Sequence, residues 1–153
     1  MLKKVFVSDN ELKTQKIAEQ FAEIARKRDI FALYGTLGVG KSVFSRAFIQ
    51  KLTAAEEVPS PTFTLLQSYP YQEMEIYHFD LYRIKNPQEI YEIGFEEAIY
   101  SGISLIEWPN NAGNLLPKDI FHINIAAQGD KRIIEVTVFS EDKASRLEQI
   151  NDC

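Results

Sequence analysis

Apolar residues follow two periodicities along the chain, and together they predict an alternation of strands and helices. Apolar residues spaced three and four positions apart predict a first helix that continues through about Arg28. Ser8 or Asp9 would cap its start, and Leu12 would lie on its apolar face. The same spacing predicts a second helix over 43–52. Alternating or continuous apolar runs predict about seven strands, at 4–7, 30–34, 65–71, 75–79, 103–106, 121–125 and 132–139.

Short polar turns at 72–73 and 128–130 join neighbouring strands closely enough to form antiparallel hairpins. Proline in a first turn and an interrupting Gly94 predict two short helical pieces between the fourth and fifth strands. The two pieces lie at 86–93 and 95–100. We also expect a loop at 110–117 and a terminal helix at 141–150.

The segment between the second strand and the second helix carries a phosphate-binding pattern. It reads Gly35-Thr36-Leu37-Gly38-Val39-Gly40-Lys41-Ser42 and fits G-x-x-x-x-G-K-[ST]. Glycines let the backbone turn tightly and point N–H groups inward, and the following helix start attracts anions. Lys41 can then reach the terminal phosphates, while the Ser42 hydroxyl can bind Mg²⁺. A chance match in a glycine-rich turn is the alternative, which the flanking strand and helix disfavour.

This motif and its flanks predict an α/β chain with a P-loop NTPase fold. The centre of the sheet should be mostly parallel, the two hairpins should add antiparallel strands, and helices should flank the sheet. No linker, internal repeat or low-complexity tract divides the sequence, so we expect one domain spanning 1–153.

Two acidic residues directly follow apolar strands, Asp80 after 75–79 and Glu107 after 103–106. Phosphoryl transfer requires a carboxylate near Mg²⁺ and a group that positions the nucleophile. Ligands of open α/β sheets bind beyond the carboxyl ends of the strands, so both acids should face the phosphate-binding loop if their strands run parallel to it. The alternative is that each is a solvated acid at a strand end.

Three further residues near these acids are of interest. Thr62 lies on a loop stiffened by two prolines and is similar to a GTPase switch threonine, although an ordinary turn threonine fits equally well. His78 precedes Asp80 by two positions and is expected to be a packed or hydrogen-bonded strand residue rather than a catalytic one. Trp108 is the aromatic residue best placed to lie near a nucleotide.

Composition narrows the function classes. The net charge of −5 over 153 residues argues against a general affinity for nucleic acid or anionic membranes. Cys153 is the only cysteine, so an intrachain disulfide is excluded. Neither a secretory signal nor an apolar stretch of about 20 residues is visible, and we expect a cytoplasmic protein without a membrane span.

Four motifs together resemble the TsaE (YjeE) family of P-loop ATPases, which act in bacterial tRNA threonylcarbamoyladenosine biosynthesis. The likeness covers most of the chain, and the order and spacing of the motifs fit. A P-loop is common to many families, whereas H-F-D-L-Y-R followed by E-W-P is far more specific. The motifs are Leu33–Ser42, Ser60–Leu65, Tyr77–Arg83 and Ile106–Pro109.

The resemblance implies that ATP and Mg²⁺ bind at the P-loop, with Trp108 and Arg132 beside the nucleotide. Ser42 and Glu107 would ligate the metal. The residues implied in catalysis are Lys41, Thr62, Asp80 and Glu107. Thr36 stands where the family more usually has aspartate, Val39 where it has alanine and Ser42 where it has threonine. Serine can still ligate Mg²⁺, whereas the loss of an acid at Thr36 leaves the hydrolysis rate open.

The resemblance also implies two protein partners, TsaD and its dimer partner TsaB. Slow ATP hydrolysis by the family member supports turnover of that complex, so its role on tRNA is indirect. A small-molecule kinase is an alternative, for which the loop Arg83–Lys85 is the one short candidate for a lid. A GTP-dependent switch is another, but it would require an N-K-x-D-type motif, which the sequence lacks.

Overall fold

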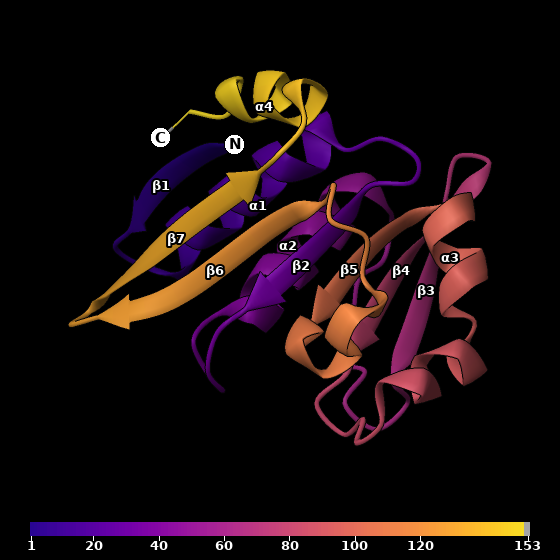
Figure 1. The fold of residues 1–153 in the computed structure, drawn as a ribbon. Helices are drawn as coiled ribbons and strands as arrows, with labels where there is room; N and C mark the ends of the chain where they lie inside the picture. Colours follow the sequence, from indigo (N-terminus) through magenta and orange to yellow (C-terminus); the bar gives the residue numbers. More distant parts are fainter. Residues whose placement is uncertain (152–153) are drawn as a thin grey trace.

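The computed structural model describes residues 1–151, and Cys153 therefore lies outside the described residues. Seven strands form a mixed sheet in the order β1-β7-β6-β2-β5-β4-β3 (Figure 1). All the predicted strands are present, with ends that shift by a few residues. Their bounds are β1 Leu2–Ser8, β2 Ile30–Tyr34, β3 Leu66–Tyr71, β4 Met74–Asp80, β5 Ile103–Glu107, β6 Phe121–Gln128 and β7 Lys131–Val138.

The centre of the sheet is parallel. Strand β2 pairs with β5 on one side and with β6 on the other, and β5 pairs in turn with β4, all in parallel. The pairs β3–β4, β6–β7 and β1–β7 are antiparallel, as the two predicted hairpins require. The predicted α/β fold is thus confirmed, and the carboxyl ends of β2, β5 and β4 meet at one edge of the sheet.

Helices cover both faces of the sheet (Figure 1). Residues of α1, α2 and α4 pack into one core cluster, and residues of η1, α3 and η2 pack into a second cluster on the opposite face. No helix within residues 1–151 is long and apolar enough to cross a membrane. The helices are α1 Glu11–Ile24, α2 Lys41–Leu52, α3 Phe95–Ser101 and α4 Glu141–Glu148, with 3-10 segments η1 Pro87–Ile93 and η2 Pro109–Leu115.

The first core cluster is built around Phe21 of α1. Its ring contacts four other phenylalanine rings at centroid distances of 5.7 to 6.3 Å, mostly edge to face. Such pairs add to the stabilisation that comes from burying apolar area alone. The cluster joins α1 and α2 to β2, so the strand and the helix that flank the P-loop share one rigid core. The four partners are Phe6, Phe31, Phe44 and Phe121.

The prediction for the first helix is wrong at both ends. Asn10 is the N-cap, because its side chain accepts the N–H of Lys13, while Ser8 belongs to β1. The helix ends at Ile24 rather than near Arg28, which adopts a left-handed conformation with φ of 78°. Leu12 also lies off the buried face, with 58% of its surface exposed.

The two short helical pieces around Gly94 are confirmed, and two other local predictions are wrong. The first piece, which starts at Pro87, is a 3-10 helix, and Gly94 with φ of 82° separates it from α3. The expected loop at 110–117 contains the 3-10 segment η2, which starts at Pro109. Helix α4 ends at Glu148 rather than at Ile150.

A buried ion pair fixes α4 against the start of β2. Arg146 donates from Nη1 to Asp29 Oδ2 at 2.5 Å and from Nη2 to Oδ1 at 3.0 Å, so the pair is bidentate. Both side chains are almost fully buried. Arg146 also donates to the carbonyl of Ile24, and Asp29 accepts the N–H of Arg26. The pair therefore holds together the end of α1, the start of β2 and α4.

We expect Arg146→Met to lower the free energy of unfolding by about 3–5 kcal/mol, because it leaves the buried Asp29 carboxylate without a counter-charge. Urea unfolding measures the change. Arg26→Met is the control: it removes an exposed pair with Asp142, which should contribute less than about 1 kcal/mol. If both variants lost the same free energy of unfolding, the buried pair would stabilise the fold no more than the exposed pair.

Candidate functional site

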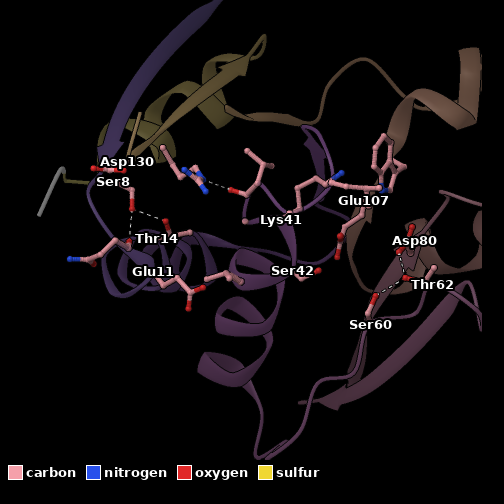
Figure 2. A pocket seen from close by; sticks show the side chains of 18 residues that line it. Ser8, Glu11, Thr14, Lys41, Ser42, Ser60, Thr62, Asp80, Glu107 and Asp130 are labelled. Atoms are coloured by element: carbon pink, nitrogen blue, oxygen red, sulfur yellow. Dashed lines mark hydrogen bonds between the residues drawn. The ribbon is translucent and has the colours of Figure 1, made fainter. Parts of the chain in front are cut away.

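A cavity of about 430 Å³ opens at the sheet edge where β2, β4 and β5 end (Figure 2). Most of the residues that the sequence marked line this one cavity. Gly35 and Thr36 do not line it, although the carbonyl of Gly35 contacts Lys41. The predicted residues that line it are Leu37, Gly38, Val39, Gly40, Lys41, Ser42, Thr62, Asp80, Glu107, Trp108 and Arg132.

Backbone conformation explains why glycine occupies two positions of the P-loop. Gly35 has φ of 147°, and a Cβ there would lie 2.6 Å from the carbonyl oxygen of Ile125 on β6. Gly40 has φ of 119° and precedes the first residue of α2. The helix therefore begins at Lys41, two residues earlier than predicted, so Lys41 and Ser42 lie in its first turn. The first N–H groups of a helix have no intrahelical partner and favour an anion.

Lys41 is buried at the centre of the cavity wall, with 4% of its surface exposed. Its Nζ donates to the carbonyl of Gly35 at 2.7 Å and lies 3.5 Å from the centroid of the Trp108 ring. Burial lowers the pKa of Lys41 from its ordinary value, because it disfavours the charged form, while the negative charges of Glu107 and Asp80 oppose that shift. The ammonium group thus has one neutral hydrogen-bond acceptor and one aromatic face.

Asp80 and Glu107 are neighbours across the parallel β4–β5 pair. Each is nearly fully buried, with 4% and 3% of its surface exposed, so neither is a solvated strand-end acid. Asp80 accepts the hydroxyl of Thr62 at 2.9 Å and the N–H of Tyr82 at 3.0 Å. Glu107 lies 2.6 Å from Nε2 of His78. His78 is therefore a hydrogen-bonded strand residue, as expected, with a partner that the sequence did not identify.

Thr62 connects the proline-containing loop, residues 58–64, to β4. Its hydroxyl contacts that of Ser60 at 2.8 Å as well as the carboxylate of Asp80. The next residue, Phe63, is 81% exposed, and the guanidinium of Arg83 lies 5.0 Å from its ring centroid. Arg83, proposed above as part of a lid, therefore packs against this loop and does not line the cavity.

At the opposite end of the cavity, sequence reasoning identified Arg132 and missed the other residues. Ser8, Thr14, Glu11 and Asp130 gather there, while Lys41 and Ser42 lie between this end and the acids (Figure 2). The hydroxyls of Ser8 and Thr14 are 2.6 Å apart. Arg132 also belongs to this end, and its Nε donates to the carbonyl of Val39 in the P-loop at 3.0 Å. Pairing of β1 with β7 sets Ser8 opposite Arg132, a relation between distant segments that no local motif marks.

The groups in the cavity fit a nucleoside triphosphate with Mg²⁺. Oxygen donors of Ser42, Asp80 and Glu107 are ligands of the hard kind that Mg²⁺ prefers. Within residues 1–151 no group of three or more His, Cys, Asp or Glu side chains could enclose a metal ion. Mg²⁺ is usually held by one or two carboxylates together with substrate phosphates, so this sparse set suits it.

Comparisons with known proteins agree on one family. The model of the family described as "Threonylcarbamoyl adenosine biosynthesis protein TsaE" matches residues 8–134. A protein of Rickettsia bellii named "tRNA threonylcarbamoyladenosine biosynthesis protein TsaE" is 40% identical over 139 residues, which are 90% of this chain and 96% of the relative. The Bacillus subtilis protein of the same name is 34% identical over 79% of this chain and 76% of its own length.

A solved structure supports the fold. The crystal structure of Bacillus subtilis YdiB superposes with a TM-score of 0.82 and 26% sequence identity. The match covers 97% of this chain and 94% of YdiB, so the likeness extends over nearly the whole chain.

We expect Lys41→Met to raise the fluorescence intensity of Trp108 in the nucleotide-free protein. The ammonium group lies against the indole ring and can quench its emission, and the substitution removes that group while keeping an unbranched side chain. Trp108 is the only tryptophan, so the signal has one source. Lys51→Met, in the last turn of the same helix, is the control. Identical spectra for the wild type and Lys41→Met would contradict the observed contact.

Proposed function

The chain belongs to the TsaE family of threonylcarbamoyl adenosine biosynthesis proteins, and from this premise we propose that it is a slow, Mg²⁺-dependent ATPase. Its hydrolysis of ATP would support TsaD and TsaB in forming threonylcarbamoyladenosine on tRNA, without direct transfer of the modifying group. The observation that carries the proposal is the convergence of Lys41 and Ser42, at the start of α2, with Asp80 and Glu107 around one cavity.

Phosphate binding is assigned to the first turn of α2 and to the glycine-rich loop before it. The free backbone N–H groups and the positive end of the helix favour the phosphates. Lys41 can exchange the Gly35 carbonyl for a phosphate oxygen, which is a stronger acceptor because it is charged. Burial makes this exchange favourable, since no described residue gives the lysine an anionic hydrogen-bond partner.

The metal site is assigned to the hydroxyl of Ser42 and the carboxylate of Glu107. When bound there, Mg²⁺ supplies positive charge to the phosphate oxygens. Asp80 has a different task in the proposal: its carboxylate, fixed by Thr62 and by the N–H of Tyr82, can orient the attacking water. A fixed orientation suits this role, because positioning is most of what phosphoryl transfer requires from a protein.

The nucleoside is assigned to the end of the cavity that holds Ser8, Thr14 and Asp130. Phosphates at the P-loop and a metal beside Glu107 leave this end for the ribose and the base. Arg132 lies there as well, but its Nε is committed to the carbonyl of Val39. In the described chain no other arginine lines the cavity, so the isolated protein lacks a free guanidinium near the acids. Slow hydrolysis without a partner is the expected consequence.

We expect Lys41→Ala to slow ATP hydrolysis by at least about 100-fold, since it removes a preorganised charge from the transferring phosphoryl group. Phosphate release is measured with Mg²⁺ and ATP, alone and with TsaB–TsaD. Lys51→Ala keeps the helix and removes a more exposed lysine that pairs with Glu23, so it should hydrolyse ATP like the wild type. A folded Lys41→Ala protein with near-normal turnover would end the ATPase proposal at this site.

We expect TsaB–TsaD to bind the ATP-loaded protein about 5–150-fold more tightly than the ADP-loaded protein, the usual range of coupling between two ligands. Thr62→Ala should reduce this ratio more than it reduces ATP affinity, because Thr62 links the loop to Asp80 and is not part of the phosphate cradle. Thr64 lies on the same loop, and its hydroxyl accepts the side-chain N–H of Gln67. Thr64→Ala should leave the ratio unchanged.

The measurement is the affinity of each variant for TsaB–TsaD with a non-hydrolysable ATP analogue, with ADP and without nucleotide. A ligand with equal affinity for two states shifts no equilibrium. Equal affinities in all three conditions for the wild-type protein would therefore contradict a nucleotide-dependent switch.

A further inference from the structure

We infer that His78 is a positioning residue for Glu107: it holds one carboxylate oxygen and leaves the other to ligate Mg²⁺. This role rests on the proposed function, since it concerns the metal of the ATPase site. Metal-binding side chains are commonly oriented by such hydrogen-bonded partners, whose loss costs about 10–100-fold in metal affinity or activity.

The register of the sheet creates the contact. In the parallel β4–β5 pair, His78 is opposite Leu105 and Asp80 is opposite Glu107. Side chains two residues apart on a strand share a face, so His78, Asp80 and Glu107 all project from the same side of the sheet. The Glu107 side chain reaches His78 diagonally, and Nε2 lies 2.6 Å from Oε2.

Burial makes this hydrogen bond strong and its geometry fixed. Only 2% of the His78 side chain and 4% of the Glu107 side chain are exposed. Hydrogen bonds to a charged group are stronger than bonds between neutral groups. A glutamate without this bond would regain freedom about its side-chain torsions. The contact thus selects one conformation of Glu107 before any metal arrives.

The second ring nitrogen of His78 bears on the direction of this hydrogen bond. Nδ1 is buried and has no hydrogen-bond partner among the described residues. Nε2 is the ring nitrogen that faces an acceptor, and a proton carried there is donated to Oε2 of Glu107. A donated hydrogen bond of this kind leaves the carboxylate oxygens as acceptors, so Glu107 can still ligate a cation.

The two oxygens of Glu107 have different surroundings. Oε2 is held by His78, while Oε1 has no hydrogen bond within residues 1–151. Glu107 lines the cavity and His78 does not. His78 can therefore act on the reaction only through Glu107, and Oε1 is the oxygen left free for the metal.

Three substitutions of His78 test the hydrogen bond. The Nε2 amide of His78→Gln can take the place of the ring Nε2 and donate to Glu107, whereas the amide of His78→Asn is one carbon shorter. His78→Leu removes every polar atom. Magnesium binding is titrated by calorimetry into each variant saturated with a non-hydrolysable ATP analogue, and analogue affinity without Mg²⁺ is measured separately.

We expect His78→Asn and His78→Leu to weaken Mg²⁺ binding by about 10–100-fold and His78→Gln by less than about threefold. Analogue affinity without Mg²⁺ should not change, because His78 is outside the cavity. In the Glu107→Gln background, His78→Asn should cause no further loss. If His78→Leu does not fold, the comparison of His78→Asn with His78→Gln still decides the matter.

Equal Mg²⁺ affinity of folded His78→Asn and wild type would overturn the positioning role, as would equal weakening by the Asn and Gln variants. These outcomes are distinct from failure of the proposed function. If the wild type binds no Mg²⁺ with the analogue, or if Glu107→Gln binds it as tightly as the wild type, then the metal site itself is misassigned.

Discussion

The parallel register of β5 with its two neighbours is the constraint on which the candidate site depends. It sets Leu33 of β2 and Asp80 of β4 on either side of Glu107, so the P-loop and both acids emerge at one sheet edge. A shift of one residue in either pair would turn every side chain to the other face. Packing on both faces of the sheet opposes that slip, because β2, β4 and β5 each contribute buried apolar residues to both core clusters.

Burial of charge at this edge is the second feature that prepares the site. Lys41, Asp80 and Glu107 are almost completely removed from solvent in one small region. Within the described part of the chain the lysine forms no ion pair with either acid; it contacts a carbonyl and the indole of Trp108. Charges held apart in this way need little rearrangement when an anion and a cation enter between them, which is the basis of electrostatic preorganisation.

The sequence predicted the half of the cavity whose residues belong to local motifs, and apart from Arg132 it missed the half that depends on long-range pairing. The P-loop and the strand-end acids are recognisable because their spacing relative to a strand is fixed by chemistry. Ser8 and Asp130 carry no such pattern, since they meet only when β1 pairs with β7. Tertiary contacts also decided the end of α1, where Asp29 is shared by Arg146 and the N–H of Arg26.

The contacts between the proline-containing loop and the P-loop lysine form a continuous series. Thr62 bonds to Asp80, which also accepts the N–H of Tyr82; the ring of Tyr82 lies 4.9 Å from that of Trp108, and Trp108 covers Lys41. Trp108 holds a left-handed conformation with φ of 59°, a costly state for a bulky residue that its neighbours must stabilise. Phosphates that draw Lys41 away would remove one of those neighbours. The loop that carries Thr62 and the phosphate-binding lysine are thus connected by a series of contacts that passes through a strained residue.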